Sequence, residues 1–190
     1  MKGYLNTFFK AVEYTDSLGF DTSSIILNTK KKILNEKILN DLYQIFLEEY
    51  KVTDEVAHYD CTNVSFQMKE IVADYLNDDV FVTTGSVSRL GGEIFSCKKS
   101  YLEHFLKNKF TFGDKLKVHV WLTLSNGEII DFTIMKNIEL MALDRNLPFN
   151  QKNIIANSLN IEALDLNYNP VLINDDYYWH IGAVKNIIVG

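Results

Sequence analysis

Two residues on neighbouring predicted strands, His119 and Asp131, have the types needed for general base catalysis. They lie in the stretch KVHVWLTLSNGEIIDFT, whose two apolar-rich arms flank a Ser-Asn-Gly sequence. This pattern predicts a β-hairpin. An aspartate is disfavoured in a strand and costly to bury alone, and a histidine nitrogen is a good partner for it. The hairpin by itself is equally compatible with an ordinary buried pair and with part of a catalytic group.

The turn of this hairpin decides whether the two side chains share a face of the sheet. If Asn126 and Gly127 alone form the turn, His119 and Asp131 lie on opposite faces. If residues 125–127 form a three-residue loop with a left-handed glycine at its end, Asp131 lies diagonal to His119 on the same face. Diagonal neighbours have Cα atoms roughly 7–8 Å apart, within reach of an imidazole and a carboxylate. The sequence permits both registers.

Cys61 is the candidate nucleophile for such a pair. It stands at the start of the predicted helix TNVSFQMKEIVADYL, where Asp60 or Thr62 can act as the helix cap. The positive end of a helix dipole lowers the pKa of a thiol, and exposed amides there can stabilise an oxyanion. The alternative for Cys61 is a small buried hydrophobic residue. Cys97, in EIFSCKK without a capping residue beside it, fits that alternative.

Other chemistry has weaker signals. The chain has no G-x-S-x-G, P-loop, G-x-G-x-x-G or H-E-x-x-H sequence. His58, Asp60 and Cys61 could approach a metal ion, but no further paired ligands accompany them, so we expect no metal site. His180, in the aromatic stretch YYWHIGAV, competes with His119 for the role of base. His119 is preferred because Asp131 can orient it.

The order of predicted elements indicates an α+β fold. Apolar residues at helical spacing predict three helices in the first part of the chain, at about 4–18, 32–50 and 61–76. The stretch VFVTTGSV then predicts a strand from Val80. Further along we expect a short strand in EIFSC, a helix at 100–108, hairpin arms at 116–124 and 128–135, a helix at 139–145, a helix near 151, and one or two strands in DDYYWHIGAVKNIIV.

The length of 190 residues suits one domain, with 1–79 mainly helical and 80–190 mainly an antiparallel sheet with short helices. The composition is 47% hydrophobic, and the net charge of −6 without a long basic run argues against nucleic-acid binding. No apolar run is long enough to span a bilayer, and the first residues do not form a signal peptide. We therefore expect a cytoplasmic protein without membrane association; a secreted effector without a signal peptide would have the same features.

Taken in order, these pieces resemble the transglutaminase-like branch of the papain-like cysteine protease superfamily. The resemblance covers about 60–133: Cys61 opens a helix, a strand follows, and the next two strands carry His119 and Asp131. It implies a cysteine helix packed on an antiparallel sheet. The N-terminal helices, which we expect to form a helical lobe, and the C-terminal tail lie outside the resemblance. The resemblance also implies that Cys61 is the nucleophile, His119 the base and Asp131 its orienting carboxylate, with no metal or organic cofactor.

The chain departs from the pattern in several places. No glycine closely precedes Cys61, and Phe132 stands where proline is frequent. Residues 52–60 contain no Gln or Asn that would supply the oxyanion donor found in papain. The remaining candidates for contacting the substrate or the oxyanion are Tyr59, Trp121 and His180.

The function implied by the resemblance is cysteine-dependent attack on an amide or related acyl group of a peptide, a protein or a small molecule. Release of the acyl group to water would make a peptidase, amidase or deamidase, and release to an amine would make a transglutaminase or acyltransferase. Two alternatives stay open. One is an inactive binding module on the same scaffold. The other is an unrelated α+β interaction protein, in which Cys61 and His119 lie far apart.

Overall fold

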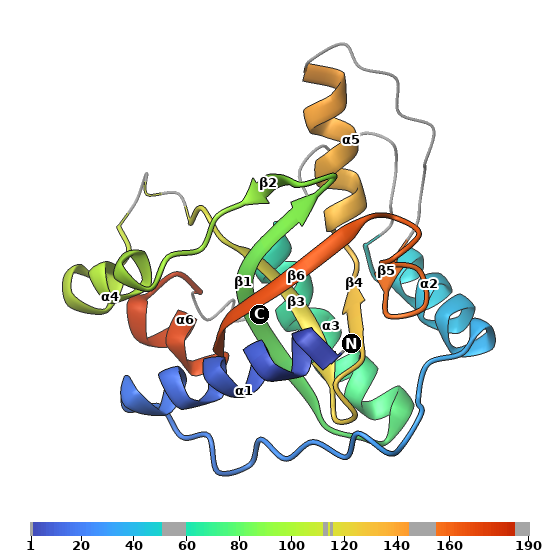
Figure 1. Ribbon diagram of the computed structural model, residues 1–190, viewed down its shortest axis with the longest axis horizontal. Helices are drawn as coiled ribbons and strands as arrows, with labels where there is room; N and C mark the ends of the chain where they lie inside the picture. Colours follow the sequence, from blue (N-terminus) through green and yellow to red (C-terminus); the bar gives the residue numbers. More distant parts are fainter. Residues whose placement is uncertain (1, 51–59, 112–113, 115, 145–154, 185–190) are drawn as a thin grey trace, which may run out of the picture.

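An antiparallel sheet forms the centre of the molecule (Figure 1). The structure is a computed structural model that describes residues 2–50, 60–111, 114, 116–144 and 155–184. Within these residues the sheet has six strands, and all pairings are antiparallel. The strands are β1 (Val80–Arg89), β2 (Gly92–Phe95), β3 (His119–Leu124), β4 (Ile129–Asp131), β5 (Ala156–Asn157) and β6 (Leu166–Ile173).

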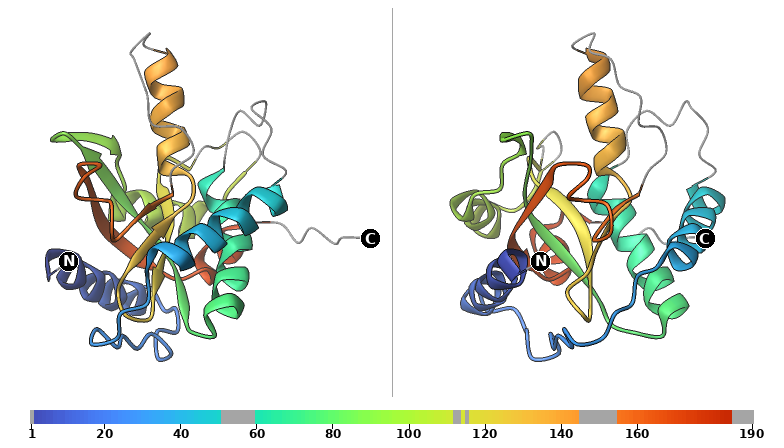
Figure 2. Two further views of the ribbon diagram at one scale, coloured as in Figure 1. Left: turned by 90° about the vertical axis from the view of Figure 1, so that its right-hand side faces the viewer. Right: turned by 45° about the vertical axis from the view of Figure 1, so that its right-hand side comes forward.

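Helices surround this sheet. They are α1 (Lys2–Ser17), α2 (Glu36–Tyr50), α3 (Cys61–Leu76), α4 (Lys99–Asn108), α5 (Ile134–Asp144) and α6 (Asp176–Ile181). The left view of Figure 2 places the sheet between α1 on one side and α3 on the other. None of the described helices has the length and apolar character to span a bilayer. Helices combined with an antiparallel sheet confirm the α+β class.

Strand β1 connects the sheet because both of its edges are paired. One edge pairs with β3 and then β2, and the other pairs with β6. The order continues from β3 through β4 to β5. Strand β6 lies in a stretch where no strand is expected from the sequence, and its Pro170 lacks the N–H that a ladder position needs. In the structure, Pro170 lies opposite Gly85 where the register shifts, and a bulge tolerates proline.

The prediction of one or two strands in DDYYWHIGAVKNIIV is wrong for residues 176–181, which form helix α6. Residues 185–189 of that stretch lie outside the described residues. The many aromatic residues of the stretch favour a strand by propensity. Packing decides otherwise: Tyr177 and Tyr178 are fully buried in the core, and the side chain of Asn174 accepts a hydrogen bond from the amide of Tyr177. Gly182, with φ of 79°, ends the helix in the left-handed conformation.

The hairpin between β3 and β4 adopts the three-residue loop. Leu122 lies opposite Ile130, and the amide of Leu124 donates to the carbonyl of Glu128 at 2.8 Å. Gly127 has a φ of 85°, as the left-handed position requires. The buried carboxylate of Glu128 holds the loop in place, because it accepts the amides that begin the segment at 33–34. The register therefore places residues 119, 121 and 131 on one face.

Gly85 in β1 is expected to tolerate no side chain. A Cβ atom there would lie 2.2 Å from the carbonyl oxygen of Asn169 and 2.7 Å from the ring of Trp121. Because the first contact is with the backbone of β6, we expect Gly85→Ala to lower the free energy of unfolding by about 3 kcal/mol. Urea denaturation would measure the change. Gly3→Ala in α1 is the control, since no atom lies within 4 Å of its Cβ position, and it should be neutral or slightly stabilising.

Candidate active site

Cys61 is the first residue of α3, as its position after Asp60 predicts. Asp60 is the N-cap, and its Oδ1 accepts hydrogen bonds from the amides of Thr62 at 2.9 Å and Asn63 at 3.3 Å. The thiol therefore lies at the positive end of a helix dipole. Its side chain is partly exposed, and it forms no disulfide with the buried Cys97.

The buried face of α3 holds Cys61 over the start of β3. Val64, Met68 and Val72 recur at helical spacing and are buried in the core. The hydroxyl of Ser65 donates to the carbonyl of Val120 in β3 at 3.1 Å. One turn earlier on the same helix, the sulfur of Cys61 lies 3.8 Å from the carbonyl oxygen of residue 118. The neighbouring residue on that strand is His119.

The structure brings His119 and Asp131 together. The Nε2 atom of His119 lies 2.6 Å from Oδ2 of Asp131, and the two side chains are 0% and 1% exposed. The contact exists because the three-residue loop puts both residues on one face of the hairpin. The turn, which the carboxylate of Glu128 holds in place, thus decides a contact between two buried ionisable groups.

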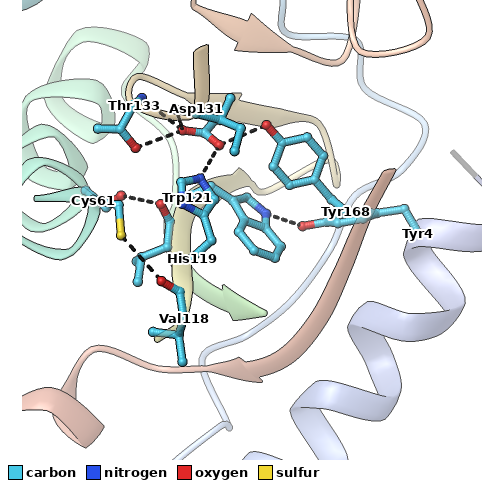
Figure 3. Close-up of polar contacts among 11 residues, drawn as sticks. Tyr4, Cys61, Val118, His119, Trp121, Asp131, Thr133 and Tyr168 are labelled. Carbon is cyan, nitrogen blue, oxygen red and sulfur yellow. Dashed lines mark hydrogen bonds and ion pairs between the residues drawn. The ribbon is translucent and has the colours of Figure 1, made fainter. Parts of the chain in front are cut away.

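Asp131 is held by hydrogen bonds from several directions (Figure 3). Its Oδ2 also accepts the hydroxyl of Tyr168 in β6 at 2.8 Å. Its Oδ1 accepts the amides of Thr133 and Ile134, each at 3.0 Å, and the hydroxyl of Thr133 at 3.2 Å. Those amides begin α5, so the carboxylate also stabilises the N-terminus of that helix. Burial raises the pKa of Asp131, but His119 and these donors outweigh burial and lower it.

The same pair keeps His119 protonated. Burial lowers the pKa of His119, but the carboxylate of Asp131 outweighs burial, and with a smaller contribution from Cys61 it raises the pKa to about 10. The imidazole also lies between two aromatic rings, with centroids 4.8 Å from Phe95 and 6.1 Å from Trp121. Both rings are nearly parallel to it, so they fix its orientation and favour its positive charge.

The second imidazole nitrogen has no hydrogen-bond partner among the described residues. Nδ1 of His119 is buried, and leaving such a group unpaired costs about 1–3 kcal/mol. In Figure 3, Asp131 lies above the imidazole and Cys61 lies to its left. The thiol is close enough to contribute to the raised pKa of His119, although its own hydrogen bond goes to Val118. Of the two imidazole nitrogens, Nδ1 is therefore the one that can bind a group at the position of Cys61.

A cleft of about 630 Å³ opens at Cys61. Phe95, which covers the imidazole of His119, forms part of its wall. The cleft combines apolar and polar side chains, and its described lining is Asp60, Cys61, Thr62, Asn63, Phe95, Phe110, Asp114, Leu116, Val118, Asn137 and Ala183. An amide or acyl group that enters this cleft can reach the sulfur atom.

A second cavity, of about 660 Å³, lies beside α1 and β6. Tyr4 and Tyr168 line it, together with serine, asparagine and glutamate side chains, and its described lining contains no cysteine or histidine. The slightly larger cavity is therefore not the one that offers nucleophilic chemistry. The cleft at Cys61 is the candidate active site.

The other predicted candidates lie elsewhere. Tyr59 and His58 fall outside the described residues. Trp121 is fully buried and donates its indole N–H to the hydroxyl of Tyr4, so it belongs to the core. His180 lies on α6, where its exposed ring packs edge-on against Phe20, and it does not line the cleft at Cys61.

Cys97 is a buried residue, as its surroundings in the sequence predict. Its side chain is 7% exposed, and burial raises the pKa of its thiol to about 12. Its amide donates to the hydroxyl of Ser86 in β1 at 2.8 Å, and this bond holds the segment that follows β2 against β1. The thiol of Cys97 is therefore an internal comparison for the thiol of Cys61.

The sequence did not reveal Tyr168, Phe95 or Asn137 as members of the site. Alternation of buried residues at Leu166 and Tyr168 is a signal for the strand, but it says nothing about the partner of the tyrosine hydroxyl. The expected role of the α3 amides is also restricted. Those of Thr62 and Asn63 already donate to Asp60 and are not free for an oxyanion.

Comparison of the chain with protein-family models, with curated proteins and with solved structures found no match. The resemblance to the transglutaminase-like proteins therefore stays a prediction drawn from the order of Cys61, His119 and Asp131. What can be proposed about function rests on the chemistry of these side chains.

Proposed function

We propose that the protein is a thiol enzyme that attacks an amide or a related acyl group. Cys61 is the nucleophile, and His119 is the group that donates and accepts the proton. Asp131 orients the imidazole and stabilises its positive charge. The observation that carries the proposal is the state of His119: one nitrogen is paired with a buried carboxylate, and the other is buried without a described partner beside a partly exposed thiol. An unsatisfied polar atom at such a place is the kind that catalysis explains.

The reaction begins from a thiolate and an imidazolium. The sulfur of Cys61 attacks the carbonyl carbon, so that a C–S bond forms and the carbonyl oxygen becomes an oxyanion. As the oxyanion collapses, the bond to the leaving group breaks and His119 gives its proton to that group. The neutral imidazole then takes a proton from water or an amine, which attacks the thioester and breaks the C–S bond. Thiolate and imidazolium are restored.

The role of Asp131 is to stabilise the protonated form of His119 and to hold its ring in place. The five hydrogen bonds to its carboxylate fix the position of both oxygen atoms, so the imidazole is held in one orientation. The triad is the same for an acyl acceptor that is water and for one that is an amine. The proposal therefore covers both hydrolysis and acyl transfer.

A binding module without catalysis is the second candidate, and one contact favours it. The sulfur of Cys61 lies 3.8 Å from the carbonyl oxygen of Val118, within range to donate to it, while Nδ1 of His119 has no hydrogen-bond partner among the described residues. In a binding module this contact would hold the sulfur on the carbonyl of Val118 instead of on the imidazole. The two candidates differ in the reactivity of a single sulfur atom.

Alkylation by iodoacetamide as a function of pH tests the proposal. We expect the native protein to react rapidly below pH 7, at a rate about 10²-fold above that of a free cysteine. Cys61→Ala should abolish the fast phase, and His119→Gln should reduce it to the rate of an ordinary thiol. Mass spectrometry of the modified peptide would identify the residue that reacts.

Cys97→Ala is the matched control, because Cys97 is the other free cysteine and is buried. It should leave the fast phase unchanged. The binding module would be favoured if the alkylation rate of Cys61 rose with pH like that of free cysteine. It would also be favoured if His119→Gln left that rate unchanged.

A further inference from the structure

The proposed reaction needs hydrogen-bond donors for the oxyanion, and the amides of residues 62–64 in the first turn of α3 already have acceptors. Thr62 and Asn63 donate their backbone N–H groups to Asp60. The side chain of Asn63 is also engaged, since its Nδ2 donates to Oδ2 of the same aspartate at 2.8 Å. Trp121, a sequence candidate for this role, is buried and bonded to Tyr4. The backbone N–H of Cys61 itself donates to none of the described residues and is one available donor. A second donor would come from another wall of the cleft.

Helix α5 supplies that wall. Its first turn lies beside the N-terminus of α3 in both views of Figure 2. Asn137 stands in this turn, where its amide donates to the carbonyl of Thr133, and its side chain lines the cleft that contains Cys61. The start of α5 is bonded to Oδ1 of Asp131. The position of Asn137 is therefore coupled to that of the carboxylate that holds His119.

The carboxamide of Asn137 forms no hydrogen bond with any described side chain or backbone group, and the residue is partly exposed at the cleft. Among the described residues it therefore has no competitor for a ligand. A carboxamide offers two N–H donors and one acceptor. Of the two carboxamides in the cleft, that of Asn63 is held by Asp60 and that of Asn137 is not.

We infer that Asn137 donates a hydrogen bond to the carbonyl oxygen of the acyl group and to the oxyanion that forms from it. The inference rests on the proposed function and adds the residue that stabilises the tetrahedral state. Such a donor is complementary to charge that develops during the reaction, so it acts on acyl transfer and not on simple alkylation. Comparing acylation with alkylation therefore separates stabilisation of the oxyanion from activation of the thiol.

The experiment compares two reactions of Cys61 in the full chain. Acylation by p-nitrophenyl acetate proceeds through an oxyanion and is followed by the burst of p-nitrophenolate. Alkylation by iodoacetamide displaces iodide and forms no oxyanion. We expect Asn137→Ala to slow acylation about 10²-fold and to leave the alkylation rate within about twofold. Asn137→Asp, which replaces the donor with a negative charge, should slow acylation at least as much.

Asn63→Ala is the matched control, since it removes the other carboxamide of the same cleft, and it should change acylation less than fivefold. Circular dichroism and thermal unfolding would establish that each variant is folded. Equal loss of acylation and alkylation in Asn137→Ala would overturn the inference, because the residue would then act on the thiol. Unchanged acylation would also overturn it.

The same measurements separate this inference from the proposed function. Fast alkylation of the native protein combined with acylation no faster than that of free cysteine would overturn the role of Asn137 and leave the activated thiol standing. Slow alkylation and slow acylation of the native protein would overturn both.

Discussion

Asp131→Ala is expected to lower the free energy of unfolding by about 3–5 kcal/mol, among the largest effects of any single substitution in this protein. The substitution leaves an imidazolium buried without its counter-ion, since His119 is 0% exposed. It also removes the acceptor of the Tyr168 hydroxyl and of the two amides that begin α5. Each buried donor that loses its partner adds to the loss.

Urea denaturation followed by tryptophan fluorescence would measure this change at pH 6. Tyr168→Phe is the matched comparison, because it deletes one of the donors to the same carboxylate and keeps the ion pair. It should cost about 1.5–3 kcal/mol. A loss for Asp131→Ala no larger than that for Tyr168→Phe would mean that the ion pair contributes nothing to stability beyond one hydrogen bond.

The stability of the fold is expected to fall between about pH 6.5 and pH 10 because of His119. Its pKa is raised from 6.5 to about 10 in the folded protein, so the unfolded chain releases this proton first as the pH rises. The contribution is complete below 6.5 and is lost as the pH approaches 10. For Asp131 the sign is opposite: its pKa is lowered from 3.8, so its contribution is complete above 3.8 and is lost as the pH falls.

The pair therefore contributes most between about pH 4 and pH 6.5. We would measure unfolding free energies of the native protein and of His119→Gln from pH 5 to pH 10. The difference between the two should be largest near pH 6 and should shrink steadily toward pH 10. A constant difference across this range would contradict the raised pKa and, with it, the ion pair. The imidazole resonances of His119 in NMR spectra offer an independent check, since they should not titrate near pH 6.5.

Several parts of the fold follow from signals within a few residues of the chain. The helical stripe of α3, its cap at Asp60 and the β-branched start of β1 are found where the sequence predicts them. The position of Cys61 at a helix N-terminus is of this kind, because capping involves only the next two or three residues. Local signals also predicted the existence of the hairpin that carries His119 and Asp131.

Other boundaries moved because distant groups changed them. The predicted arm 128–135 ends as a strand at Asp131, and the helix expected at 139–145 begins at Ile134. The carboxylate of Asp131 explains both differences: its acceptance of the Thr133 and Ile134 amides turns the chain and begins the helix. That carboxylate is fixed in turn by His119 and by Tyr168, 37 residues away.

By itself the sequence determined which residues of this protein have catalytic types, and that Cys61 begins a helix while His119 and Asp131 lie on paired strands. Only the tertiary structure decided that the pair shares a face, because Glu128 holds the three-residue loop against amides 94 and 95 residues away. It also decided that Asn137 lines the cleft, where its carboxamide has no hydrogen-bond partner among the described residues. Contacts of this kind join distant segments through single hydrogen bonds and leave no periodic pattern along the chain. Propensity and spacing therefore predict elements, and packing selects the partners.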